Sequence, residues 1–162
     1  MPAIFRVHVT KDHLTFCSGH FITYEGNQCE RLHGHNYRVA VEVDGPLDSN
    51  FYVFDFIALK KITMAISDEL DHRMMLPLKN PHIKVEQTGE QVEVRFEGKR
   101  WSFPREDCVL LPIENTTAEL LARYIASRLK TTLHSEYHFF PTRLAVEVEE
   151  SHGQSAVYVE TA

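Results

Sequence analysis

Three side chains with metal-binding chemistry stand close together in the segment CERLHGHNY, residues 29–37. Cys29 lies four residues before His33 and six before His35. On a β-strand His33 and His35 point to the same face, with Cβ atoms about 6.5–7 Å apart. Two imidazoles at this separation can converge on one metal ion. The competing interpretation is a solvated strand face in a chain that has ten histidines.

His20 is the third candidate ligand, because it lies near the end of the preceding predicted strand, which a hairpin can bring alongside His33 and His35. Three neutral nitrogens suit zinc and leave a fourth coordination position open, as in catalytic zinc sites. Cys29 is then either a fourth ligand that closes the site or a thiolate base beside the metal. A third possibility is a small buried hydrophobic side chain, and this interpretation we adopt for Cys17 and Cys108.

Two further groups could carry acid–base or binding chemistry. Asp71 precedes His72 at the end of a predicted helix, and a carboxylate can orient an imidazole and raise its basicity. The alternative is a histidine that only interacts favourably with the negative C-terminal end of the helix dipole. Glu150 shares strand parity with Leu144 and Val148, so it either receives donors from a ligand or ends the strand in water.

Hydrophobic periodicity predicts the elements that position these residues. Alternating residues predict strands that include residues 5–9, 16–21 and 37–43, paired as an antiparallel hairpin. A helix begins after Asp55, with Leu59, Ile62, Ile66 and Leu70 at helical spacing. A second helix opens at TTAE, where Thr116 and Glu119 have capping-box spacing, and its stripe is Leu121, Ile125, Leu129 and Leu133. Two strands, 144–150 and 156–160, close the chain.

This order predicts an α+β fold with a four-stranded antiparallel sheet and two helices on one face. Residues 82–103 alternate around the turns TGE and EGK, and they predict a small β-meander inserted between the helices. We expect a single domain over residues 1–162, with the insertion at about 74–112.

Composition restricts the functional class. A net charge of -6 argues against a nucleic-acid-binding protein, and no stretch reaches the roughly 18 apolar residues of a membrane helix. The first ten residues lack the apolar core of a signal peptide, and three cysteines without framework spacing suit a reducing compartment. We expect a cytoplasmic protein that binds neither nucleic acid nor membrane.

Several segments together resemble the 6-pyruvoyltetrahydropterin synthase family, which includes the 6-carboxytetrahydropterin synthases of the queuosine pathway. These segments are FCSGHF, CERLHGHNY, YVFDFIALKK, LDHR, ENTTAELLA and VEVEES. The match covers nearly the whole chain outside residues 74–112, where short bacterial members have only a brief loop. Thr116 also replaces a proline that is common in the family.

The resemblance implies a role for each matching residue. The implied zinc ligands are His20, His33 and His35, and the implied catalytic residues are Cys29, Asp71 and His72. Thr117 and Glu119 would contribute to pterin binding, and Glu150 would anchor the pterin ring. Arg31 and Arg73 are nearby candidates for triphosphate contacts.

The resemblance also implies the tunnelling fold (T-fold), a homo-hexamer built as a dimer of trimers, and active sites at subunit interfaces. Three residues separate Cys29 from His33, as in the 6-carboxytetrahydropterin synthases. We therefore expect a zinc-dependent lyase, a 6-carboxy-5,6,7,8-tetrahydropterin synthase that acts on 7,8-dihydroneopterin triphosphate. The alternatives are triphosphate elimination of the 6-pyruvoyltetrahydropterin synthase type and a non-catalytic pterin-binding relative.

Overall fold

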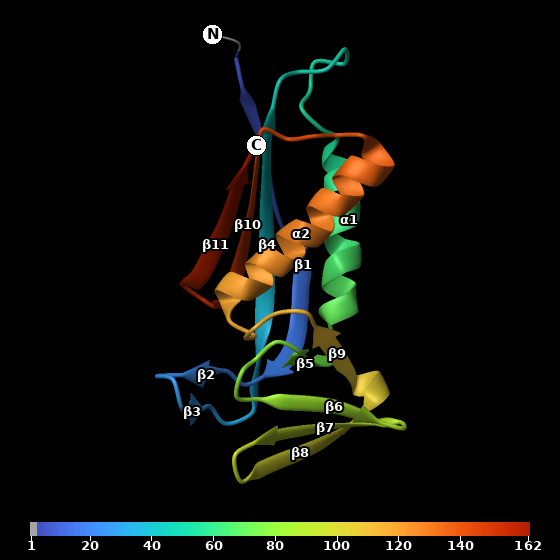
Figure 1. Cartoon of the computed structure of the whole chain (residues 1–162). Coiled ribbons are helices and arrows are strands. Elements are labelled where there is room, and N and C mark those ends of the chain that lie inside the picture. The colour runs from blue at the N-terminus through green and yellow to red at the C-terminus, as the bar shows by residue number, and fades with distance from the viewer. Residues whose placement is uncertain (1–2) are drawn as a thin grey trace.

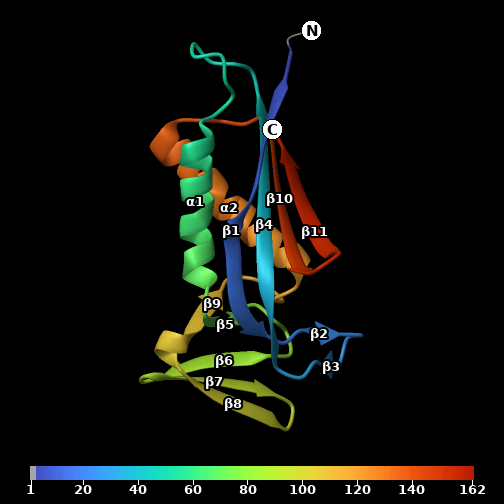
Figure 2. The ribbon, with the colours of Figure 1, turned by 180° about the vertical axis from the view of Figure 1, so that it is seen from behind.

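The computed structural model describes residues 3–162. In chain order its elements are β1 (Phe5–His20), β2 (Thr23–Tyr24), β3 (Gln28–Cys29), β4 (His33–Gly45), α1 (Phe56–Leu70), β5 (Arg73–Pro77), β6 (Lys84–Thr88), β7 (Gln91–Phe96), β8 (Lys99–Pro104), a 3₁₀ turn (Arg105–Asp107), β9 (Cys108–Leu111), α2 (Ala118–Tyr137), β10 (Arg143–Ser151) and β11 (Gln154–Thr161). Both helices lie on one face of the large sheet (Figure 1). Seen from behind, the other face of β1, β4, β10 and β11 is uncovered (Figure 2).

The large sheet has six strands, in the order β11-β10-β4-β1-β5-β9. The predicted antiparallel core is present, because β1 pairs with β4, β4 with β10, and β10 with β11 in antiparallel register. The prediction of four strands was wrong: β5 joins β1 and β9 joins β5, both in parallel. Both strands are short, and β5 ends at Pro77. Because proline is rare inside strands, sequence patterns assign this segment to a loop. A parallel neighbour of β1 also requires a crossover connection, which α1 supplies.

Both predicted helices are present, and the N-cap of α2 differs from the predicted one. Asp55 caps α1 by accepting the Ile57 N–H at 2.9 Å. The expected capping box between Thr116 and Glu119 is not formed, because the N-cap of α2 is Thr117, whose hydroxyl accepts the Leu120 N–H at 3.3 Å. Thr116 is instead fully buried beneath the helix start.

One hydrophobic core joins the helices to the sheet. The predicted stripes of both helices are buried against the inward-facing residues of β1, β4 and β10. Leu121 and Leu129 are fully buried, and truncating such a leucine to alanine typically costs about 2–5 kcal/mol. The core therefore fixes both helices against β1, β4 and β10.

The predicted β-meander is present as a separate three-stranded sheet, β6-β7-β8, with antiparallel pairing throughout. A second hydrophobic cluster attaches this sheet to the ends of β1 and β5 through Phe21, Met74 and Leu76. It lies at the lower end of the molecule in Figure 1, below β1 and α1. The meander is thus packed on its own chain, beside the strand that carries His20.

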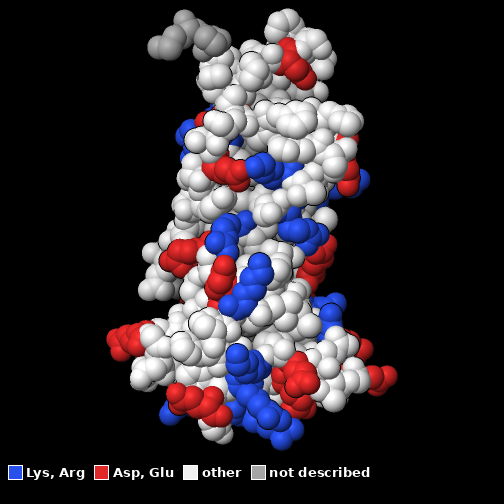
Figure 3. Space-filling view, viewed as in Figure 1, with Lys and Arg blue, Asp and Glu red and all other residues white. Residues whose placement is uncertain are grey.

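Charged side chains of both signs are interspersed over the helix-covered face (Figure 3). Basic side chains gather in the middle of the lower end, with acidic side chains on either side. Among the residues the structure describes, neither helix is long and apolar enough to cross a membrane.

Candidate metal centre and adjoining pocket

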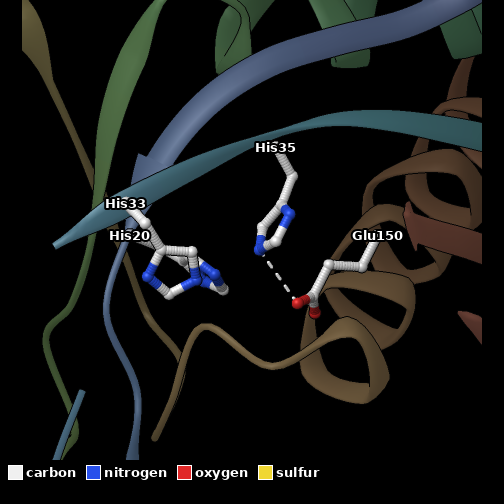
Figure 4. A group of neighbouring side chains, drawn as sticks. All are labelled: His20, His33, His35 and Glu150. Carbon is white, nitrogen blue, oxygen red and sulfur yellow. Dashed lines mark ion pairs between the residues drawn. The ribbon is translucent and has the colours of Figure 1, made fainter. Parts of the chain in front are cut away.

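Four potential metal ligands meet where β1, β4 and β10 lie side by side. His20, the last residue of β1, pairs with His33, the first residue of β4, and His35 follows on the same face. Glu150 comes from β10, the neighbour of β4 on its other side. One ligand atom from each of these residues lies within 4.8 Å of all the others. Figure 4 shows the three imidazoles and the Glu150 carboxylate turned toward one common point.

Backbone carbonyls set the tautomer of two of these histidines. Nδ1 of His20 lies 2.9 Å from the Thr116 carbonyl oxygen, and Nδ1 of His33 lies 2.7 Å from the Arg31 carbonyl oxygen. A carbonyl oxygen only accepts, so each Nδ1 carries the hydrogen and each Nε2 keeps its lone pair. Carbonyls that orient imidazoles in this way are typical of metal-bound histidines.

The donor set fits a metal ion. Among residues 3–162, Nε2 of His20 and Nε2 of His35 are buried and have no hydrogen-bond partner. The Glu150 Oε1 atom lies 3.0 Å from Nε2 of His35, but the two atoms make no hydrogen bond. Burial lowers the pKa of His20, which keeps this imidazole neutral and able to bind a cation. Three imidazoles with a position left for another ligand suit zinc.

Cys29 lies beside this group but is not part of it. It is partly buried, and it packs against the cluster formed by Phe21 and the meander. Burial raises the pKa of its thiol, while the nearby Lys99 acts in the opposite direction. The fourth side chain among the clustered ligand atoms is Glu150 and not Cys29, so the geometry does not place Cys29 among the candidate metal ligands.

Asp71 and His72 form the pair that the sequence suggested. Asp71 ends α1; its Oδ1 accepts the Cys17 N–H at 2.8 Å, and its Oδ2 lies 2.9 Å from Nδ1 of His72. The Cys17 N–H is the largest cause of the lowered pKa of Asp71, and His72 adds to it. The His72 side chain is 83% exposed, and neither residue belongs to the metal-ligand group. Within one chain the pair therefore faces solvent.

The three residues expected to bind the pterin line one pocket. Thr117 and Glu119 come from the start of α2, and Glu150 comes from the end of β10. The pocket has a volume of about 270 Å³, and Ile22 and Gln154 also contribute to its wall. Glu150 thus stands between the histidine group and this pocket, and its carboxylate can serve either.

Sequence patterns did not identify three residues of the site. The Glu30 carboxylate accepts the Ile22 N–H at 2.9 Å and lies 3.9 Å from Nε2 of His33. Thr116 orients His20 through its carbonyl, and the Tyr37 ring contacts His20 and His35. Of the three, only Tyr37 had a usable signal, since it continues the alternation of His33 and His35 on one strand face.

Known proteins resemble this chain in sequence over most of its length. The sequence profile described as 6-pyruvoyl tetrahydropterin synthase matches residues 8–161. A Methanocaldococcus jannaschii protein, provisionally named 6-carboxy-5,6,7,8-tetrahydropterin synthase, is 39% identical over 150 residues, which cover 90% of this chain and 89% of that protein. The Haemophilus influenzae 6-carboxy-5,6,7,8-tetrahydropterin synthase is 31% identical over 72% of this chain and 77% of its own length.

A solved structure gives the same fold over nearly the whole chain. The Plasmodium vivax 6-pyruvoyltetrahydropterin synthase superposes with a TM-score of 0.91 at 28% sequence identity, and the match covers 99% of both chains. Coverage this complete includes the β6-β7-β8 meander and the strands β5 and β9. These elements therefore belong to an architecture that both chains share.

Proposed function

The chain belongs to the 6-pyruvoyl tetrahydropterin synthase family and is a lyase of that family, and we propose that it is a zinc-dependent 6-carboxy-5,6,7,8-tetrahydropterin synthase. The substrate would be 7,8-dihydroneopterin triphosphate. The single observation that carries this proposal is the group of His20, His33 and His35 beside a pocket lined by Glu150. Relatives that bear the same activity name, at 39% and 31% identity, support the choice of branch.

His20, His33 and His35 would hold the zinc ion. When bound, zinc supplies Lewis-acid chemistry, which polarises oxygen atoms of a ligand and makes their protons more acidic. The carbonyls of Thr116 and Arg31 keep two of the imidazoles in the tautomer that binding requires. These contacts preorganise the site before any substrate arrives.

Glu150, Thr117 and Glu119 would hold the pterin ring in the adjoining pocket. A pterin presents neighbouring N–H donors along one edge, and a carboxylate is the side chain best suited to accept from them. Glu150 is placed for this because it lines the pocket while remaining close to His35. The hydroxylated side chain of the substrate would then extend toward the histidines.

Cys29 would move a proton at the substrate side chain. Its thiol has a raised pKa in this environment, so it needs a nearby cation to become a thiolate. Lys99 is one such cation, and a dication among the histidines would be a stronger one. Glu30, whose carboxylate lies 3.9 Å from Nε2 of His33, is a second group that could accept a proton here.

His72, oriented by Asp71, would exchange a second proton. Its exposed side chain lies apart from the metal-ligand group of the same chain. An exposed pair is what an active site shared between subunits requires, as the hexamer expected for this family would provide. We propose that the Asp71–His72 pair of one subunit serves the histidine group of a neighbour.

The test is to identify the products formed from 7,8-dihydroneopterin triphosphate. Incubation with the zinc-loaded protein should yield 6-carboxytetrahydropterin, triphosphate and a two-carbon aldehyde, detected by mass spectrometry. Loss of triphosphate with the whole carbon side chain retained would establish the alternative activity, the 6-pyruvoyltetrahydropterin synthase reaction. The structural likeness to the Plasmodium vivax enzyme favours this second candidate. Tight pterin binding with no product would indicate a non-catalytic relative.

A further inference from the structure

Three buried side-chain polar atoms lack a hydrogen-bond partner among residues 3–162. They are Nε2 of His20, Nε2 of His35 and the hydroxyl oxygen of Tyr37. Buried polar atoms without a partner are few in folded proteins, and each calls for a physical explanation. A metal ion would account for the two imidazole nitrogens. The hydroxyl of Tyr37 is left without a partner.

Tyr37 contacts two of the candidate metal ligands. Its ring centroid lies 5.9 Å from that of His20 and 5.6 Å from that of His35, with the planes close to perpendicular. Phe16 on β1 stacks on the same ring, at a centroid distance of 4.7 Å and an interplanar angle of 13°. The ring is therefore held in place by packing, whereas its hydroxyl makes no hydrogen bond with the described residues.

Exposure falls along this face of β4. The side chain of His33 is 36% exposed and that of His35 is 21% exposed, while Tyr37 is fully buried. The site is thus open at His33 and closed at Tyr37. Glu149 pairs with Arg38 between β10 and β4, so the next residues on each strand, Glu150 and Tyr37, lie side by side. Tyr37 forms the inner wall beside the carboxylate that faces the pocket.

The phenol of a tyrosine is a neutral hydrogen-bonding group near neutral pH. A neutral phenol is a donor to an oxygen atom and a poor metal ligand, since ligands bind metal ions in their deprotonated form. A tyrosine is also longer than a histidine, so its hydroxyl stands further from the strand than the imidazole nitrogens. This hydroxyl is therefore available to donate to an acceptor atom of a bound ligand.

We propose that Tyr37 is a substrate-binding residue whose hydroxyl donates a hydrogen bond to a side-chain oxygen of the substrate as it enters the histidine group. This inference deepens the proposed function and rests on it for the identity of the ligand. The recognised chemistry is more general: a hydroxyl or other oxygen donor that approaches His20 and His35 from the open end of the site. The pterin ring itself, in the adjoining pocket, would not contact Tyr37.

The test compares wild-type protein with Tyr37→Phe, which keeps the stacked ring and removes only the hydroxyl. Tyr124→Phe is the matched control, because the Tyr124 hydroxyl accepts from Arg128 at 2.8 Å on α2, away from the site. Three probes are titrated into the Co²⁺-loaded proteins: 7,8-dihydroneopterin, 6-methyl-7,8-dihydropterin, which has no side-chain hydroxyl, and acetohydroxamate, an oxygen-donor ligand without a pterin ring. Binding is followed by Co²⁺ absorption and by calorimetry.

Tyr37→Phe should weaken the binding of 7,8-dihydroneopterin and of acetohydroxamate about fivefold to tenfold, as expected for the loss of one neutral hydrogen bond. It should leave 6-methyl-7,8-dihydropterin unchanged, and metal-free protein should melt at the wild-type temperature or above, because an unsatisfied buried hydroxyl is gone. Two results would overturn the role of Tyr37. One is a Tyr37→Phe protein that binds each of the three probes as tightly as the wild type does. The other is a lower melting temperature together with equally weakened binding of all three probes.

The failure of the proposed function would look different. If wild-type protein binds neither pterin but Tyr37→Phe still weakens acetohydroxamate, the pterin substrate is wrong and the oxygen-binding role of Tyr37 stands. If the wild type converts the pterin substrate and Tyr37→Phe binds every probe as tightly, the function stands and this inference is overturned.

Discussion

The indole ring of Trp101 stacks on the phenyl ring of Phe21, with centroids 4.5 Å apart and planes inclined by 21°. Phe21 directly follows the candidate ligand His20, and Trp101 lies in β8 of the meander. The same hydrophobic cluster includes the partly buried Cys29. This stack therefore joins the small sheet to the strand end that carries the metal centre, and it gives the meander a direct way to influence the site.

Replacing Trp101 by alanine should loosen the end of β1. The loss of a partly buried aromatic stack should cost about 1–3 kcal/mol of unfolding free energy and lower turnover more than it lowers zinc content. Trp101→Phe keeps an aromatic partner for Phe21, so it should retain most of the unfolding free energy and most of the turnover. Denaturant unfolding and steady-state kinetics measure the two effects. If the alanine and phenylalanine variants behave alike, the stack has no functional importance.

The histidine group predicts about one zinc ion per chain, held by three imidazoles. Alanine at His20, His33 or His35 should each remove most of the metal, since an open three-ligand site cannot spare a donor. His152→Ala, in the turn between β10 and β11, is the matched control and should retain full occupancy. Elemental analysis of the purified variants measures the zinc content. Full zinc content in all three histidine variants would show that these residues do not bind the metal.

Cys29→Ala separates a base from a ligand. Because Cys29 lies outside the clustered ligand atoms, the variant should keep its zinc and its fold. Turnover should fall by a factor on the order of 10²–10⁴, as expected for a lost acid–base group. Cys108→Ala, at a buried thiol in β9, should leave turnover near the wild-type rate. A Cys29→Ala protein without zinc would instead make Cys29 a ligand.

Glu150→Gln should weaken pterin binding by roughly 10- to 100-fold, the effect of losing a charged acceptor at a hydrogen bond. Zinc content should stay unchanged if the main partner of Glu150 is the pterin. Glu149→Gln changes the neighbouring residue, which alternates to the other face of β10, and should leave affinity as it is. Pterin titration is compared with metal analysis for both variants. A joint loss of zinc and pterin would assign Glu150 to the metal, which its 3.0 Å distance from His35 makes a real alternative.

Asp71 should make the stability of the fold depend on pH in the acid range. The Cys17 N–H and His72 hold the pKa of this carboxyl below its ordinary value, so the folded state binds fewer protons than the unfolded state. Its contribution is present above the ordinary pKa of an aspartate, about 3.9, and is lost as the pH falls through the depressed pKa. Asp71→Asn should therefore melt lower than wild type at neutral pH, with a smaller difference in acid.

Melting temperatures measured from about pH 7 down to about pH 3 test this dependence on Asp71. Asp68→Asn, on the exposed side of α1, serves as the control for the general effect of removing a carboxylate. Parallel melting curves for Asp71→Asn and wild type across the whole range would show that Asp71 contributes nothing to acid sensitivity.

Local periodicity was sufficient to predict the helices and most strands. Leu59, Ile62 and Ile66 stand at i, i+3 and i+7, and a helix places all three on one buried face. Alternation placed His33 and His35 on the same face for the same kind of reason, since strand side chains repeat every two residues. These predictions need no knowledge of the rest of the chain.

Strand order and capping depended on contacts that no local pattern contains. β5 and β9 are short segments whose strand identity comes from pairing with β1, across the α1 crossover. The N-cap of α2 is Thr117, whereas Thr116, one residue earlier, is buried with its carbonyl bonded to His20. The local sequence offers both threonines as caps, and it contains no sign of the contact between Thr116 and the distant His20.

The sequence by itself determined which residues could form a metal centre, because imidazoles two apart on a strand share a face. Only the tertiary structure decided their partners. The pairing of His20 with His33 depends on an irregular register between Thr10 and Thr15 of β1. The approach of Glu150 depends on β10 adding to β4 more than one hundred residues along the chain. Register and strand order are settled by burial of the whole core, and among the described residues the core also leaves the buried Tyr37 hydroxyl without a protein hydrogen-bond partner.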